Sequence, residues 1–117
     1  MYELPSDQDL AELPGKKLAL ISCSANQVIL QFDERTSLAA EASFTLSDGA
    51  GGEEPVEIPL SRVSLLAFLE NEIAGVDVLD ARRTLVLRFS SGRSLRFMSD
   101  TAYESFHLKL KGRVFVV

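Results

Sequence analysis

Only two residues of the types that most often act as general base or nucleophile stand out in this sequence, and each occurs once. His107 is the single histidine and Cys23 the single cysteine among 117 residues. A histidine can act as a general base, but no serine or cysteine in a nucleophile motif accompanies His107. Cys23 lies in the apolar run 17–24, which favours a central strand, where a thiol behaves as a small hydrophobe. We therefore expect no catalytic residues, no metal site and no cofactor, in a protein that is not an enzyme.

A glycine-rich stretch with several carboxylates interrupts the middle of the chain. The segment SDGAGGEEP at 47–55 has no hydrophobic period and reads as an exposed loop. It lacks the lysine of a phosphate-binding loop, and its acids would repel phosphate. Acidic surfaces accelerate association with basic proteins. The sequence therefore predicts a partner-binding surface formed by four acidic residues: Asp48, Glu53, Glu54 and Glu57.

Two arginines form the second candidate site. Arg88 and Arg96 are expected directly opposite each other on the outer face of a hairpin, where they could hold an anionic ligand. The isoelectric point near 4.8 and the lack of interleaved aromatic residues do not favour nucleic acid as that ligand. A small half-barrel that binds an anionic ligand thus stays open as the alternative to a protein-binding module.

Charge is distributed unevenly along the chain. Residues 1–72 hold 13 acidic and 4 basic side chains, a net of −9, and residues 73–117 hold 4 acidic and 8 basic, a net of +4, which sum to −5. Either the first part offers an acidic surface to a basic partner, or the two parts pack together and their charges compensate across the sheet.

An internal repeat of one β-hairpin organises the chain. VILQFDERTSL at 28–38 aligns with LVLRFSSGRSL at 85–95, and Gly15 aligns with Gly75 when three residues are gapped. Alternation places the large apolar residues of both copies on one face. The expected registers pair Phe32 with Leu38 and Phe89 with Leu95, each across a three-residue loop. Phe32 and Phe89 should then fill equivalent core positions.

Between the repeats the apolar period becomes helical. Ser61 is a plausible N-cap, residues 62–73 have a helical apolar stripe, and Gly75 fits a C-terminal cap. The predicted fold class is α+β: a curled, mostly antiparallel half-barrel of seven to nine strands with one covering helix. A single domain is expected, consisting of an N-terminal arm or helical turn at 1–14, a first β repeat at 15–46, an acidic loop and edge segment at 47–60, a helix at 61–74 and a second β repeat at 75–117.

The ends of the chain carry further information. The apolar C-terminal strand 114–117 should either lie inside the sheet or pair with a second chain as a homodimer. No apolar run reaches the roughly 18 residues of a membrane span. The acidic N-terminus does not resemble a signal peptide, which predicts a cytoplasmic protein without membrane contact.

The second hairpin and the segment after it resemble a known kind of protein. The pattern L-x-L-x-F-x-x-G-x-x-L-x-F at 85–97, followed by Tyr103-Glu104-Ser105-Phe106, resembles a family of small uncharacterised bacterial β-rich domains. In size and charge such domains are similar to immunity proteins, which neutralise toxins. The resemblance implies a protein that binds and blocks a basic toxin domain, such as a nuclease.

Overall fold

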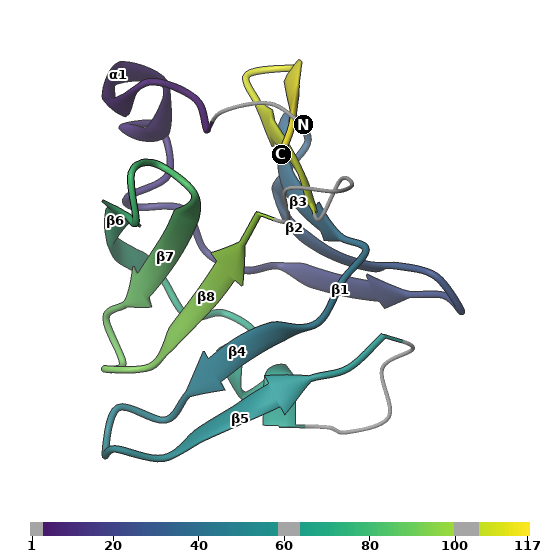
Figure 1. Cartoon of the computed structure of the whole chain (residues 1–117), viewed down its shortest axis with the longest axis vertical. Helices are drawn as coiled ribbons and strands as arrows, with labels where there is room; N and C mark the ends of the chain where they lie inside the picture. The colour runs from purple at the N-terminus through teal and green to yellow at the C-terminus, as the bar shows by residue number, and fades with distance from the viewer. Residues whose placement is uncertain (1–3, 59–63, 100–105) are drawn as a thin grey trace.

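The chain forms two antiparallel five-stranded sheets that face each other across one core (Figure 1). This computed structural model describes residues 4–58, 64–99 and 106–117. Two helical turns accompany the sheets, α1 (Asp7–Leu10) and η1 (Ser64–Phe68). Sheet I has the order β1 (Leu20–Cys23), β2 (Val28–Asp33), β3 (Thr36–Ala40), β9 (Phe106–Leu110), β10 (Arg113–Val116). Sheet II has the order β5 (Glu53–Val56), β4 (Phe44–Ser47), β8 (Ser94–Met98), β7 (Thr84–Phe89), β6 (Ile73–Leu79).

The predicted α+β class and its covering helix are wrong. The helical segment η1 is a 3₁₀ turn of five residues, and Ile73 and Gly75 belong to β6. Glu70 has a positive φ of 66°, which ends any helix before Ile73, and the β-branched residues of the next segment favour a strand. Ser61 and the rest of 59–63 lie outside the described residues. The half-barrel is also wrong, because the strands form two sheets that do not close.

The two sheets exchange hairpins. In sheet I the meander β1–β2–β3 is extended by β9–β10, and in sheet II the meander β6–β7–β8 is extended by β4–β5. The contacts that join them correspond: β3 pairs with β9, and β8 pairs with β4. Each half of the chain therefore forms three strands of one sheet and two strands of the other, which makes the halves topologically equivalent.

The crossing point of the halves repeats the same hydrogen bonds twice. Gly15 N–H donates to Ile73 O at 2.8 Å, and Glu70 N–H donates to Leu18 O at 2.7 Å. Ile73 N–H donates to Lys16 O, and Leu18 N–H donates to the Asn71 carbonyl. Leu18 and Ile73 are fully buried. Gly15 thus corresponds to Glu70, rather than to Gly75 as the sequence alignment suggested.

This correspondence predicts the effect of Glu70→Gly. Gly15 and Glu70 both have positive φ, 92° and 66°, but only glycine adopts this region without a steric cost. Glu70→Gly should raise the free energy of unfolding by up to about 1 kcal/mol, measured by urea denaturation, because the relieved strain of roughly 1–2 kcal/mol exceeds the flexibility cost of glycine. Gly15→Ala, which meets no neighbouring atom, should lower it by about 1 kcal/mol. A less stable Glu70→Gly protein would refute the correspondence.

The predicted core faces are confirmed, but the hairpin registers differ by two residues. Phe32 and Phe89 are both buried, at 6% and 3% exposure. Leu38 lies opposite Leu30 rather than Phe32, and a bulge at Phe32 leaves a two-residue turn. In the second hairpin Leu95 lies opposite Leu87 in the same way. A shift of two residues keeps every side chain on its face, so burial is unchanged.

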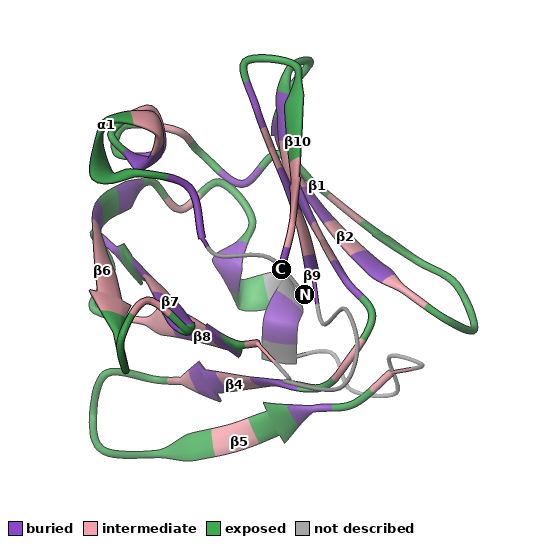
Figure 2. Ribbon diagram, turned by 45° about the horizontal axis from the view of Figure 1, so that its top comes forward, coloured by how far each residue is buried: buried purple, intermediate pink, exposed green. Residues whose placement is uncertain are grey.

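Buried positions alternate with less buried ones along strands of both sheets (Figure 2), and three phenylalanines link the sheets inside the core. The Phe97 ring stacks on Phe44 with centroids 4.8 Å apart and lies 5.6 Å from the Phe106 ring. Phe44 and Phe97 belong to sheet II and Phe106 to sheet I. Leu10 and Leu13 from the N-terminal arm are buried in the same core, so the predicted helical turn is present but is packed.

The two edge strands of sheet I, β1 and β10, differ from what the sequence predicted. β1 is an edge strand with three of its four residues exposed, and Cys23 is exposed rather than buried. β10 is also an edge strand, so it does not lie inside its sheet; its pairing with a second chain stays a prediction. The Arg113 guanidinium lies 5.0 Å from the Phe115 ring centroid, which places a charge at this edge. Among the described residues, no helix is long and apolar enough to span a bilayer.

Candidate functional site

The outer face of sheet II brings one predicted acidic residue, Glu53, together with the two predicted arginines. Residues opposite one another in antiparallel strands share a face, and here that face alternates with buried Leu46, Leu87 and Leu95. The residues that form the outer face of sheet II lie in three rows: Glu53, Ser47, Ser94, Arg88 and Gly75; Pro55, Thr45, Arg96, Val86 and Asp77; and Met98, Thr84 and Leu79.

Both arginines on this face are paired with carboxylates. Arg88 Nε donates to Asp77 Oδ2 at 2.7 Å, and Arg96 Nη2 lies 3.7 Å from Glu53 Oε1. Arg88 lies opposite Ser94 and Arg96 lies opposite Val86, so the arginines are diagonal neighbours rather than directly opposed. Arg96 Nε is buried and has no hydrogen-bond partner within the described structure. The Arg96 guanidinium is thus incompletely hydrogen-bonded, although its Nε is not exposed to solvent.

The four acidic candidates do not form one patch. Glu53 lies on the outer face, whereas Glu54 lies opposite Leu46 and shares the inner face with it. Glu57 follows β5 and is exposed. The Asp48 carboxylate accepts hydrogen bonds from the N–H groups of Ala50 at 2.7 Å and Gly52 at 3.0 Å, which hold the pKa of Asp48 below its ordinary value. Asp48 therefore shapes the β4–β5 loop, and Glu53 and Glu57 are the exposed acids of the four outside that loop.

The sequence did not indicate the apolar part of this face. Met98 is 58% exposed and Leu79 is 48% exposed, and both flank the buried Thr84. The Thr84 hydroxyl donates to Asp80 Oδ2 at 2.7 Å, which satisfies it. The outward position of Met98 follows from the inward positions of Leu95 and Phe97, so strand alternation was the available signal. The face is therefore charged at one end and apolar at the other.

The equivalent face of sheet I carries different side chains. When the strand pairs of the two equivalent halves are matched, Arg96 corresponds to Ala39, Arg88 to Gln31 and Glu53 to Val114. His107 lies on the face of sheet I, and its Nε2 is 2.7 Å from Glu41 Oε1. The outer face of sheet I thus lacks counterparts of Arg88, Arg96 and Glu53, and carries Lys109 and the His107–Glu41 contact instead.

Ion pairs between the halves account for much of the uneven charge. In the described part of the chain, four pairs of formally charged side chains join residues 1–72 to residues 73–117, and Glu41 also contacts His107. The four are Asp7–Arg82, Glu53–Arg96, Glu12–Lys111 and Asp9–Arg113. Compensation between the halves, one of the two alternatives raised by the sequence, is therefore part of the explanation. No group of three metal-ligating side chains occurs among the described residues.

Comparison with known proteins gives a family. The sequence profile of a family of unknown function, DUF6188, matches residues 10–117. The chain belongs to this family. Membership supports the resemblance to a family of small uncharacterised β-rich domains, although Tyr103-Glu104-Ser105 of its motif lies outside the described residues. No curated protein and no solved structure matched the chain.

Proposed function

We propose that this DUF6188 member is a non-enzymatic protein-binding module whose binding surface is the outer face of sheet II. The observation that carries the proposal is the exposure of Met98 and Leu79 on the same open face as Arg88 and Arg96. Protein interfaces are enriched in methionine and arginine and combine an apolar centre with a polar rim. This combination supports a protein partner.

The same geometry gives weaker support to a small anionic ligand. Ligand pockets are usually concave and bury most of the ligand, whereas Arg88 and Arg96 project from an open sheet. Each guanidinium also faces a carboxylate already.

The partner proposed is a basic toxin domain that acts on nucleic acid, which makes this protein an immunity protein. Glu53 and Glu57 are exposed at the β5 edge beside the outer face. Carboxylates in this position could occupy sites where a nuclease expects phosphates. Charged contacts would mainly accelerate association, and apolar contacts such as Met98 would slow dissociation.

Charge reversal tests this proposal. The double variant Glu53→Lys, Glu57→Lys should slow association with the toxin by about tenfold at low salt and reduce protection in cells that coexpress a toxin encoded beside this gene. Both side chains are exposed, so the fold should persist even though the new lysine at 53 would lie near Arg96.

A matched variant separates position from net charge. Glu34→Lys, Glu41→Lys changes net charge equally on the side of sheet I, where both acids are exposed. This variant should protect cells as well as the natural protein does. Equal protection by both double variants would rule out the β5 edge as the contact. If the toxin encoded beside this gene does not bind the natural protein, the proposed immunity role is wrong.

A further inference from the structure

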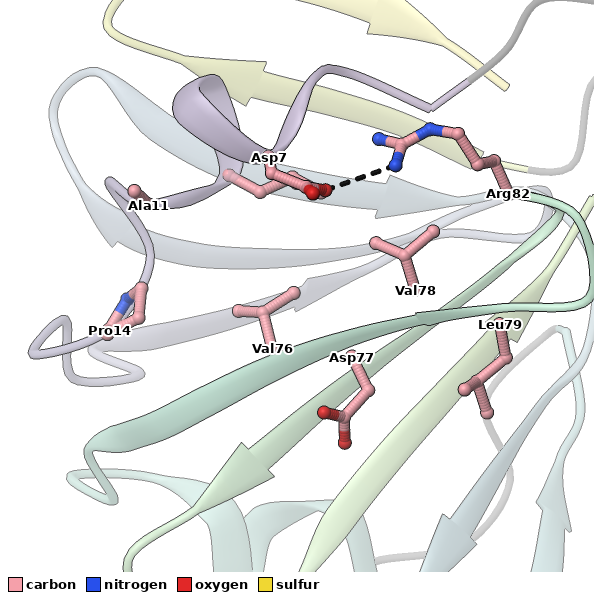
Figure 3. Close-up of a pocket in the computed structure, with 9 residues that line it drawn as sticks. Asp7, Ala11, Pro14, Val76, Asp77, Val78, Leu79 and Arg82 are labelled. Carbon is pink, nitrogen blue, oxygen red and sulfur yellow. Dashed lines mark hydrogen bonds and ion pairs between the residues drawn. The ribbon is translucent and has the colours of Figure 1, made fainter.

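An open groove lies between α1 and the free edge of β6 (Figure 3). Its volume is about 390 Å³, and its apolar walls come from Leu10, Ala11, Pro14, Val76 and Val78. Val76 and Val78 point toward α1, whereas Asp77 and Leu79 point away from it, toward the outer face of sheet II. The groove adjoins the outer face of sheet II, because Asp77 and Leu79 line the groove and also belong to that face. A ligand in the groove would contact Val76, Val78 and the β6 edge, which are not part of the outer face.

The free edge of β6 presents unpaired backbone groups to this groove. Phe89 N–H donates to Arg93 O on the β8 side, so alternation along β7 directs the groups of Arg88 and Val86 toward β6. Their partners in β6 are Gly75 and Asp77. The N–H and C=O groups of Val76 and Val78 therefore face the free edge, where an added strand could pair with them.

The chain already shows what kind of segment fits this edge. Lys17 bridges antiparallel to Glu72, and Gly15 N–H donates to Ile73 O, so residues 15–17 pair with the start of β6 like a short strand. At Pro14, which has no N–H, the chain leaves the edge and continues back into α1. A second extended segment would continue the same ladder along residues 76–78.

Charge at the groove favours a basic segment. Asp7 lines it with a side chain that is 86% exposed, and Asp77 lies beside it. Arg82 closes one end, because its Nη1 lies 3.1 Å from Asp7 Oδ1 and its Nη2 donates to Pro5 O. Asp7 keeps a carboxylate surface open to a cation. The same acids would oppose each other if β6 paired with β6 of a second copy, which disfavours that occupant.

We propose that the β6 edge binds an extended segment of a partner protein in which apolar and basic residues alternate. The segment adds a sixth strand to sheet II antiparallel to β6. Its apolar side chains lie on Val76 and Val78 beneath α1, and its basic side chains, which project from the other face of the new strand, lie beside Asp77.

The test uses a fluorescein-labelled hexapeptide of alternating valine and lysine, with binding followed by fluorescence anisotropy. Val78→Pro removes the edge N–H and should weaken binding by about tenfold. Val114→Pro is the matched control, because Val114 also directs its N–H to a free edge, that of β10, and should bind the peptide normally. Ala11→Arg, at an exposed position, fills the groove without touching β6 and should also weaken binding.

Each outcome decides the proposal. A peptide of alternating valine and glutamate should bind more weakly than the lysine peptide. Equal binding of the lysine peptide to natural protein, Val78→Pro and Ala11→Arg would overturn the proposal, as would no binding at all. Dimerisation of the natural protein that Val78→Pro abolishes would assign the edge to a second copy and also overturn it.

Discussion

Replacing Phe32 or Phe89 by alanine is expected to lower the free energy of unfolding by about 3–5 kcal/mol. Both rings are buried at equivalent positions of the two halves, and both belong to the single core between the sheets. Phe89 also meets the Phe68 ring edge-to-face, with centroids 5.1 Å apart. Because domains of this size are stable by only about 5–15 kcal/mol, either change removes a large share of stability.

Urea denaturation of the two variants measures this effect. Met98→Ala is a suitable control, because Met98 is exposed and its truncation should change stability by no more than about 0.5 kcal/mol. The two phenylalanine variants should resemble each other more closely than either resembles the control. A loss below about 1 kcal/mol for one of them would mean that its half does not contribute an equivalent part of the core.

Met98→Glu is expected to weaken binding of the partner by roughly thirtyfold, or about 2 kcal/mol. Met98 lies on the outer face of sheet II with 58% of its surface exposed, so the protein itself should tolerate the change. A partner that covers Met98 would lose this apolar contact and would have to desolvate the new carboxylate, which is costly. Surface plasmon resonance with the purified partner measures the affinity.

Leu20→Glu provides the matched comparison on the opposite sheet. Leu20 is 54% exposed and lies on the outer face of sheet I, opposite Gln31. Leu20→Glu should leave affinity within about twofold of the natural protein. If Leu20→Glu were the damaging change and Met98→Glu were harmless, the binding surface would belong to sheet I.

Strand faces could be predicted from the sequence, but registers could not. Alternation in 28–38 and 85–95 identifies the buried side, and Phe32, Phe89, Leu38 and Leu95 are buried as predicted. The same alternation cannot distinguish registers that differ by two residues, since both bury the same side chains. In the first hairpin the observed register includes a bulge at Phe32, and no residue type there signals it.

The helix was wrongly predicted and the sheet arrangement could not be predicted from the sequence, for different reasons. Leu65, Phe68 and Ile73 do form one buried set, but the positive φ of Glu70 separates the turn from the strand, and glutamate rarely adopts it. The exchange of hairpins depends on the pairing of β3 with β9 and β4 with β8, which are distant in sequence. The residue pattern of one hairpin does not indicate which distant strand will pair with it.

The candidate site was found in part. Glu53, Arg88 and Arg96 do share the outer face of sheet II, although the acidic and arginine groups were predicted as separate alternatives. The remaining acids were grouped by sequence proximity, whereas strand alternation directs Glu54 to the other face and hydrogen bonds occupy Asp48. Charge alone could not reveal the exposed apolar residues.

Site-specific photo-crosslinking tests most directly whether the outer face of sheet II binds a protein. p-Benzoyl-phenylalanine would replace Met98 in one variant and Glu41, the position corresponding to Met98 in the repeat, in the other. Irradiation in native host cells should crosslink the Met98 variant to one discrete protein and leave the Glu41 variant without that product. A product formed only from the Glu41 variant, or no product from the Met98 variant, would contradict the assignment of this face.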